Sequence, residues 1–248
     1  MEKTTKDFIF GLRPVIEAIE SGQTVDKILI KKGLTGDLVK ELYKAVADYK
    51  VPLQHVPIEK IEQITKKNHQ GVLAFLSAVE FFDLDTIISD VFSEGKNPFI
   101  VVLDQITDVR NLGAIIRSAE CAGAHAILVP TKGSARIGAD TVKTSAGALY
   151  HIPICRTDAL PNQIKNLKKS GLQIICGTEK TEENYYNVDL TMPFALIMGS
   201  EEFGVSPEIM RLGDRFAKIP INGKIKSLNV SSAASIIMYE AVRQRFIM

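Results

Sequence analysis

The chain has 248 residues, and its 30 basic and 29 acidic side chains leave a formal charge of +1. Apolar residues make up 46% and charged residues 24%, close to the average of globular proteins, which argues against a disordered or fibrous chain. The near-neutral charge removes the simplest argument for a nucleic-acid partner, a strongly basic chain, although a basic face offset by acidic residues elsewhere stays compatible with one.

Several further classes of protein are disfavoured. No window approaches the roughly 18 consecutive apolar residues of a membrane span, and the start M-E-K-T-T-K-D-F lacks the apolar core of a signal peptide. The three cysteines form no C-x-x-C pair, and the four histidines form no H-x-x-x-H pair. We therefore expect no membrane, no metal and no disulfide framework, and a reduced, cytoplasmic setting.

Residues 1–76 are predicted to form a small α/β unit. Val15, Ile16 and Ile19 recur at helical spacing after Pro14, a residue suited to the first turn of a helix. The other expected elements are a strand at 27–31, a helix at 36–50, an extended segment at 51–57, a helix at 58–67 and a strand at 71–76. The expected order is therefore α-β-α-β-α-β.

Residues 77–97 differ in composition from the segments on either side. They hold five acidic residues against a single lysine and end in G-K-N-P. We interpret this stretch as a linker or domain boundary. Two alternatives stay open: a helix at 84–92, and one continuous domain without a boundary.

From residue 98 onward, short apolar strands alternate with helices. Strands are expected at 99–104, 126–130, 151–155, 173–178, 194–199 and 216–221, and helices at 112–122, 139–146, 160–170, 206–212 and 231–246. Apolar strands separated by helices predict a parallel sheet covered on both faces. Such sheets bind ligands at the carboxyl ends of their strands, so the loops after the strands are the candidate site.

The loop after the strand at 99–104 leads into N-L-G-A-I-I-R-S-A at 111–119. Asn111 is a candidate helix cap, and Gly113 permits a close backbone approach. Arg117 lies in an otherwise apolar stretch and needs an anion or carbonyl groups for its five N–H donors. A structural salt bridge is the alternative explanation for this arginine.

Two later loops carry unusual polar residues. The segment at 197–205, I-M-G-S-E-E-F-G-V, has two glutamates between glycines. Their carboxylates repel phosphate and suit a neutral or cationic ligand. Ser206 and Pro207 follow as the expected cap and first residue of a helix. S-L-N-V-S-S-A at 227–233 has more polar residues than a helix cap requires. The sequence contains neither G-x-G-x-x-G nor G-x-x-x-x-G-K-[ST], and these loops suggest no Ser-His-Asp arrangement, so nucleotide-phosphate binding and hydrolase chemistry are both disfavoured.

These three segments, the third together with I-P-I at 219–221, have the order and spacing of the signature motifs of the SpoU (TrmH) family of RNA 2′-O-ribose methyltransferases, which they resemble, over about residues 98–248. Residues 1–76 resemble the family's L30e-like RNA-binding domain through G-L-R-P-V-I-E-A and N-H-Q-G-V. One departure is Asp108-Val109-Arg110, where the family usually has Asp-Pro. It leaves Asn111 and Arg117 in place.

The resemblance implies an α/β fold in two domains. An L30e-like RNA substrate-binding domain is expected at 1–76, an acidic linker at 77–97, and a SPOUT-type methyltransferase domain at 98–248, with a mostly parallel sheet and a deep trefoil knot. The implied activity is methyl transfer from S-adenosylmethionine to the ribose 2′-hydroxyl of a guanosine in the peptidyl-transferase region of 23S rRNA, carried out by a homodimer.

Other functions stay open beside this one. Within the family, the alternative is methylation of tRNA or of another rRNA site, as in antibiotic-resistance enzymes. Outside it, a pure RNA-binding module with a degenerate catalytic domain would be expected to lack Arg117 or Asn229, and both are present.

The resemblance also assigns the site residues. The implied catalytic residues are Asn111, Arg117, Glu201 and Asn229. The residues implied to bind S-adenosylmethionine are Thr178, Gly199, Ile219, Ser227 and Leu228. Candidates for RNA contacts are Arg13, Lys66, Lys67 and Arg110, and no metal is expected. Two roles stay open for Arg117: a base assisted by an RNA phosphate, or a cationic clamp for the developing alkoxide, because a free guanidinium has a pKa above about 12.

The overall charge divides unevenly among these segments. Residues 1–76 carry 12 basic and 10 acidic groups, residues 77–97 carry 1 and 5, and residues 98–248 carry 17 and 14. Both expected domains are thus mildly basic, which is compatible with an RNA recognised by shape and splayed bases more than by bulk attraction.

Overall fold

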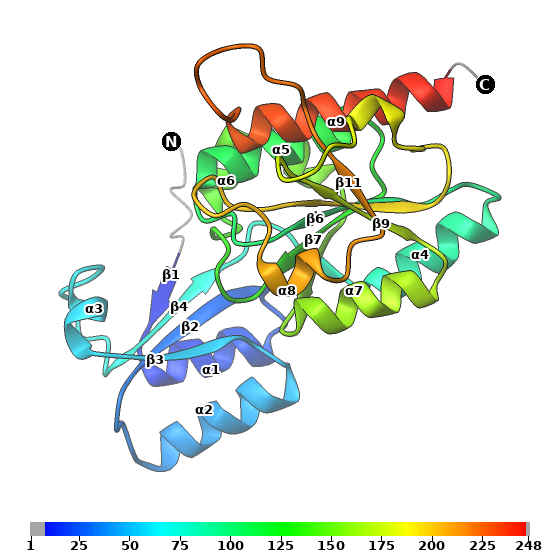
Figure 1. Cartoon of the computed structure of the whole chain (residues 1–248). Coiled ribbons are helices and arrows are strands. Elements are labelled where there is room, and N and C mark those ends of the chain that lie inside the picture. Colours follow the sequence, from blue (N-terminus) through cyan, green and yellow to red (C-terminus); the bar gives the residue numbers. More distant parts are fainter. Residues whose placement is uncertain (1–7, 247–248) are drawn as a thin grey trace. The chain divides into compact units, whose positions relative to one another are not determined.

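The structure, a computed structural model, describes residues 8–246 (Figure 1). The chain forms two compact units: one reaches to Glu80 and includes Arg136–Ala139, and the other contains the remaining residues. We refer to them as the N-terminal and the C-terminal unit. Within residues 8–246, no helix combines the length and the apolar character needed to cross a membrane.

The N-terminal unit is built on a four-stranded sheet in the order β1-β4-β2-β3. Its elements are β1 (Phe8–Phe10), α1 (Leu12–Glu20), β2 (Val25–Lys31), α2 (Asp37–Asp48), β3 (Leu53–Val56), α3 (Ile58–Glu62) and β4 (Val72–Leu76). β4 is antiparallel to β1 and β2, whereas β2 and β3 are parallel. The expected alternation of helices and strands is present. Strand β1 is an addition, and its three residues are too few to show a period.

Both faces of this sheet are covered, as the alternation of side chains along β4 shows. Val72 and Ala74 belong to one apolar cluster, which also contains the buried sides of α1 and α2. Leu73 and Phe75 belong to a second cluster with Ile61 of α3. The unit therefore has helices on both sides of a small mixed sheet.

The stretch expected to be an acidic linker is partly folded onto the C-terminal unit. β5 (Phe81–Phe82) pairs in parallel with β8 (Ile154–Thr157), and α4 (Leu84–Ser93) follows β5. Leu84 and Ile88 are buried in the core of that unit, while Asp85 and Asp90 are exposed on the same helix. The helix alternative is therefore correct, and the acidic residues form the solvent side of an amphipathic helix.

The C-terminal unit contains a seven-stranded sheet in the order β11-β9-β10-β6-β7-β8-β5, and every neighbouring pair is parallel. Its further elements are β6 (Phe99–Leu103), α5 (Val109–Cys121), β7 (Ala126–Pro130), α6 (Ala139–Thr144), α7 (Leu160–Lys169), β9 (Gln173–Gly177), β10 (Phe194–Met198), α8 (Pro207–Met210), β11 (Arg215–Ala217) and α9 (Val230–Phe246). Strand β8 begins later than expected, because Pro153 has no N–H for the sheet. Strand β11 ends earlier than expected. Directly after it, the Lys218 backbone N–H donates to the Glu183 carbonyl.

Helices lie on both faces of this sheet (Figure 1). On one face, α4, α7 and α8 pack against alternate residues of β6 such as Ile100, through Ile88, Ile164 and Ile209 respectively. On the other face, α5 and α9 pack against each other, and the Ser118 and Ser235 hydroxyl oxygens are 2.7 Å apart. The predicted parallel sheet with two covered faces is confirmed.

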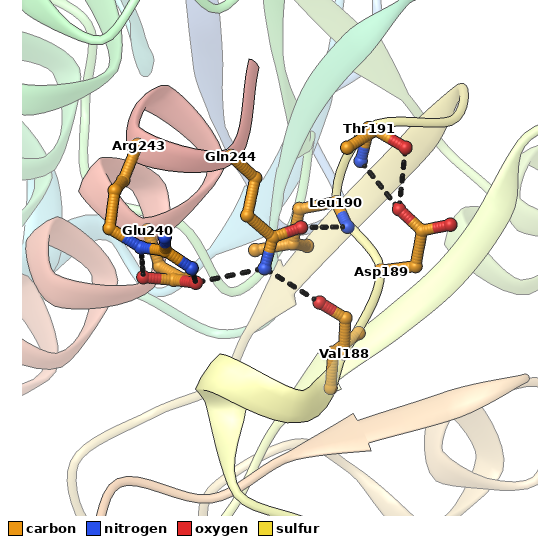
Figure 2. A network of polar contacts seen from close by, with 7 residues as sticks. All are labelled: Val188, Asp189, Leu190, Thr191, Glu240, Arg243 and Gln244. Atoms are coloured by element: carbon orange, nitrogen blue, oxygen red, sulfur yellow. Dashed lines mark hydrogen bonds and ion pairs between the residues drawn. The ribbon is translucent and has the colours of Figure 1, made fainter. Parts of the chain in front are cut away.

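The C-terminal helix is tied to the crossing between β9 and β10 (Figure 2). Gln244 accepts a hydrogen bond from the Leu190 N–H (2.8 Å) and donates one to the Val188 carbonyl (3.0 Å). Earlier in the same crossing, the Tyr185 N–H donates to the Lys218 carbonyl just after β11. The segment 178–192 thus contacts the chain both before and after the loop that leads to α9. The knot expected from the family resemblance would involve these segments, and it stays a prediction.

Candidate functional site

The candidate site lies at the carboxyl edge of the C-terminal sheet. The chain proceeds from β6 to β7 and β8 on one side, and places β9, β10 and β11 on the other. Parallel sheets bind ligands in the crevice at such a switch point. The loops after β6 and β10 flank this point, and the start of α9 borders the same cavities.

Helix α5 begins three residues earlier than expected, and Asp108 is its cap. The Asp108 carboxylate accepts hydrogen bonds from the backbone N–H groups of Arg110 (2.8 Å) and Asn111 (3.0 Å). These bonds, that of Asn111 first, hold the pKa of Asp108 below its ordinary value. The prediction that Asn111 caps the helix is therefore wrong, and its side chain is available for other contacts. Val109 stands where the family usually has a proline, and this difference leaves the Asp108 cap intact.

Gly113 brings α5 very close to the end of α6. A Cβ atom at this position would lie 2.0 Å from Thr144 Oγ1 and 2.8 Å from the Ser145 backbone nitrogen. The Thr144 hydroxyl donates to the Val109 carbonyl at 3.1 Å, which fixes this contact at the first turn of α5. The expected close backbone approach at Gly113 is confirmed.

The loop after β10 is a tight turn. Ser200 and Gly204 exchange two backbone hydrogen bonds of 3.1 and 2.9 Å, and a Cβ on Gly199 would lie only 2.1 Å from the Gly204 carbonyl carbon. The Ser206 N–H donates to the buried Asp104 carboxylate at 2.7 Å, which ties this loop to the end of β6. Ser206 does precede α8, but its side chain makes no capping bond.

Asn229 joins the three loops. Its Oδ1 accepts hydrogen bonds from the Ser231 N–H (2.9 Å) and the Ser232 N–H (3.4 Å) and so caps α9. Its Nδ2 donates to Asn111 Oδ1 at 3.0 Å and to Glu201 Oε1. Three of the four residues assigned to catalysis, from segments far apart in the chain, therefore form one polar cluster, which we call the Asn229 cluster.

Two cavities adjoin this cluster. The first, of about 430 Å³, has the residues assigned to the cofactor on its wall: Thr178, Gly199, Ile219, Ser227 and Leu228. The second, of about 360 Å³, is lined by Asn111 together with Gln105 and Gly133. Both fall within the range of small-molecule sites, and they share the wall formed by residues 200–203.

Arg117 does not join the Asn229 cluster within this chain. It lies exposed on α5, and its side chain makes no hydrogen bond or ion pair with another residue of the described range. It follows Asn111 by six residues, or one and two-thirds turns, so the two side chains leave the helix on different sides. Residues 8–246 therefore provide no structural salt bridge for this arginine.

The four candidates for RNA contacts are all exposed. In the N-terminal unit, Arg13 pairs with Glu41 at 3.2 Å, while Lys66 and Lys67 lie in the loop between α3 and β4. In the C-terminal unit, Arg110 lies 3.5 Å from the Asp108 carboxylate.

Sequence reasoning missed two kinds of residue here. Asp104 and Asp108 organise the loop after β6, and the signal for Asp108 was present, since an aspartate before an apolar helix is a common cap. Gln105 and Phe203 line the cavities. Phe203 lies within the motif at 197–205, but nothing in the sequence marks its ring or the Gln105 side chain as part of a cavity wall. Within residues 8–246, no group of three His, Cys, Asp or Glu side chains is placed to hold a metal ion.

Residues 98–239, more than half of the chain, match the model described as the "SpoU rRNA Methylase family". The chain belongs to this family. Residues 8–82 match a second model, described as "RNA 2'-O ribose methyltransferase substrate binding". The SpoU match contains all of the Asn229 cluster, and the substrate-binding match coincides with the N-terminal sheet.

Relatives share the full two-unit length of this SpoU protein. "Putative TrmH family tRNA/rRNA methyltransferase YacO" of Bacillus subtilis is 31% identical, with 96% of each chain covered. A protein of the same generic name from Staphylococcus saprophyticus is 35% identical, with 96% of this chain and 95% of the relative covered.

Solved structures of SpoU methyltransferases have the same fold. AviRb from Streptomyces viridochromogenes, in complex with the cofactor AdoMet, is 27% identical with a TM-score of 0.61, covering 97% of this chain and 91% of that one. An AdoMet-bound rRNA methyltransferase from Sinorhizobium meliloti is 26% identical with a TM-score of 0.60, covering 95% and 86%. The SPOUT-type α/β fold expected from the resemblance is confirmed.

Proposed function

We propose that this SpoU family member transfers a methyl group from S-adenosylmethionine to the ribose 2′-hydroxyl of a guanosine in 23S rRNA. The observation that carries the proposal is the Asn229 cluster, in which Asn111, Glu201 and Asn229 meet at the boundary of two cavities. One cavity suits the methyl donor, and the other leaves room for the nucleoside that accepts the methyl group.

The first cavity fits S-adenosylmethionine by the chemistry of its wall. Met198, Leu228 and Ile237 offer apolar surface for an adenine ring. Glu201 and Glu202 favour a cation over a phosphate, and a sulfonium is a cation. Lys180, also on the wall, can pair with the amino-acid carboxylate of the same ligand. We assign Thr178, Gly199, Ile219, Ser227 and Leu228 to this ligand.

The chain's own contribution to the reaction is alignment. When bound, S-adenosylmethionine supplies an electrophilic methyl group whose departure leaves a neutral thioether. The cluster holds Glu201 and Asn111 at fixed positions through Asn229, so their oxygen atoms can orient the ribose hydroxyl groups. Orientation of this kind contributes ~7–11 kcal/mol in favourable cases.

Arg117 is assigned the role of a cationic clamp on the 2′-oxygen as the hydroxyl proton passes to solvent water. A guanidinium free in water has a pKa above about 12, so it is a poor base but a good donor to developing negative charge. The Arg117 side chain is exposed and bonds to no residue in the described part of its own chain. We therefore propose that it acts in the active site of a second copy, within a homodimer. The outer side of α9, which packs on α5, supports such an interface through the exposed Tyr239 and the half-buried Ile236.

The choice of 23S rRNA rests on the two-unit layout. It resembles that of RlmB, the family member that methylates a guanosine ribose in the peptidyl-transferase region, and the N-terminal match to a substrate-binding model supports an RNA substrate. An rRNA substrate implies action in the cytoplasm. Arg13, Lys66, Lys67 and Arg110 are proposed to contact phosphates, since all four are exposed cations.

The proposal is tested by methylating RNA from a strain that lacks the gene. The purified protein and tritiated S-adenosylmethionine are incubated with total RNA, and the label is followed into rRNA and tRNA. We expect label in 23S rRNA, recovered after digestion as 2′-O-methylguanosine, at one position in primer extension. Label in tRNA alone would favour the alternative substrate, and label on a base would refute 2′-O transfer.

A further inference from the structure

Phe203 is an exposed aromatic residue on the wall shared by the two cavities. It is 68% exposed and lines both of them. Its N–H donates to Ser200 Oγ at 3.1 Å, inside the turn closed by the Ser200 and Gly204 backbone bonds, so the ring stands on a short, well-bonded loop. Single exposed apolar residues are ordinary on protein surfaces. Phe203, however, lies two residues from Glu201 of the Asn229 cluster and borders two cavities. This position indicates that its ring has a function.

Gln105 is the second unusual residue of the second cavity. Its backbone has φ = +61°, a left-handed conformation that is uncommon for a residue other than glycine. The neighbours hold it there, because Asp104 is buried and bonded to Ser206, and the Ile106 carbonyl accepts from the Ala135 N–H at 2.8 Å. Backbone strain that persists at a cavity is a pointer to function, since the surroundings must stabilise it.

We propose that the second cavity receives the base of the target nucleoside, with Phe203 stacking on its face and Gln105 bonding to its polar edge. The inference rests on the proposed function and goes further, because it names the side chains that position the base. A nucleobase has a flat π-face and an edge of donors and acceptors, which match an aromatic ring and a carboxamide. Proteins that modify or read single nucleotides commonly splay a base out and stack it on an aromatic side chain.

The position of the shared wall supports this assignment. Residues 200–203 separate the cavities, and Glu201 within that wall bonds to Asn229. A nucleoside whose base enters the second cavity therefore has its ribose close to the boundary with the first. That boundary is where the acceptor oxygen must lie for transfer from a donor in the first cavity.

The absence of tryptophan from the sequence allows a direct test of stacking. The Phe203→Trp variant carries the sole tryptophan, and its fluorescence is followed as the demethylated cofactor and then the target RNA are added. We expect strong quenching on addition of RNA. The matched control is Phe92→Trp, at an exposed phenylalanine of α4 outside both cavities, which should show little quenching. Quenching by the cofactor alone, with none added by RNA, would assign Phe203 to the cofactor and overturn the proposal.

Kinetics provide a second test. Phe203→Ala should lower kcat/KM for RNA about tenfold or more, as expected when an aromatic ring that stacks on a base is removed, while cofactor affinity changes less than about twofold. Gln105→Gly should lower kcat/KM for RNA without lowering Tm, because glycine adopts a positive φ freely. Phe92→Ala serves as the unchanged control.

The outcomes separate this inference from the proposed function. If the native protein methylates RNA but Phe203→Ala and Gln105→Gly do so with native kcat/KM, the base subsite is refuted and the methyltransferase activity stands. If the native protein methylates no RNA, the proposed function fails and the subsite falls with it.

Discussion

Asn229 Nδ2 donates a hydrogen bond to Asn111 Oδ1 at 3.0 Å, which connects the start of α9 to the first turn of α5 across 118 residues of sequence. The other atom of the same carboxamide, Oδ1, caps α9 through the Ser231 and Ser232 N–H groups. One side chain thus sets both the beginning of a helix and the position of two residues of the candidate site.

Substitution of Asn229 should separate these two roles. Asn229→Ala removes the cap and the bridge, and should cost about 1 kcal/mol of stability and about 100-fold in kcat. Asn229→Asp retains a capping oxygen but no donor for Asn111 or Glu201, so activity should fall equally while the cap persists. The double variant Asn229→Asp with Glu201→Gln restores a donor–acceptor pair and should recover stability relative to the single aspartate variant. Equal activity of Asn229→Asp and the native protein would refute the positioning role.

The role of Arg117 can be tested across pH. Arg117→Lys keeps a cation, so a clamp should leave measurable activity at neutral pH that declines as the lysine loses its proton near pH 10. Arg117→Met should be inactive throughout. If Arg117→Lys is inactive at every pH, the clamp is disfavoured and the base assisted by an RNA phosphate becomes the better account.

A shared active site makes a distinctive prediction for mixed subunits. Arg117→Ala and Asn229→Ala should each have little activity alone. If Arg117 acts in the site of the second copy, a mixed dimer has one site with both substitutions and one with neither. Unfolding and refolding an equal mixture should then restore roughly a quarter of native activity, since half the dimers are mixed and each has one intact site. No recovery from a mixture shown to contain mixed dimers would place both residues in the site of one subunit.

Replacing Gly113 with alanine has two opposing effects on stability, and the unfavourable effect is the larger. Alanine is a better helix former than glycine by about 1 kcal/mol, but its Cβ here would lie 2.0 Å from Thr144 Oγ1 and 2.8 Å from a backbone nitrogen. Overpacking of this kind typically costs about 1–3 kcal/mol or more, so Gly113→Ala should lower Tm by several degrees. Gly223→Ala, at a glycine with no atom within 4 Å of the added Cβ, is the control and should leave Tm nearly unchanged. A higher Tm for Gly113→Ala would contradict the packing seen here.

The order of strands and helices in both units could be predicted from apolar periodicity, because that signal is local. Composition was a weaker guide at 77–97, where five acidic residues suggested a linker. Leu84, Ile88 and Val91 recur at helical spacing in the same stretch and are buried. Periodicity therefore deserved more weight than charge in this segment.

The site was predictable only in part, for physical reasons. The residues that meet at Asn229 could be named because three motifs carried the resemblance, but their hydrogen bonds depend on distant segments folding together. The left-handed backbone of Gln105 is imposed by its anchored neighbours, and the presentation of Phe203 by a turn that Ser200 closes. Neither is encoded in local propensity, which is why both escaped prediction.

Glu240 should make the stability of the C-terminal unit depend on acid pH. This buried carboxylate accepts hydrogen bonds from Arg243 and from Gln244, which in turn bonds to the crossing between β9 and β10 (Figure 2). The hydrogen bonds from Arg243, with that from Gln244, hold the pKa of Glu240 below its ordinary value of 4.5. A carboxylate with a depressed pKa stabilises the fold at pH above 4.5, and this contribution is lost as pH falls through the folded-state pKa.

Glu240→Gln should therefore lower Tm at pH 7 by a few degrees, equivalent to about 1 kcal/mol after allowance for the exposure of Arg243. The difference from the native protein should shrink as pH falls below 4.5 and through the lowered folded-state pKa of the native carboxylate. Glu94→Gln, at an exposed carboxylate paired with Lys96, is the control and should change Tm little at any of the pH values tested. Thermal scans at pH 7, 5.5 and 4 measure this dependence, and an equal difference in Tm at all three would show that the charge of Glu240 contributes nothing to the anchoring of α9.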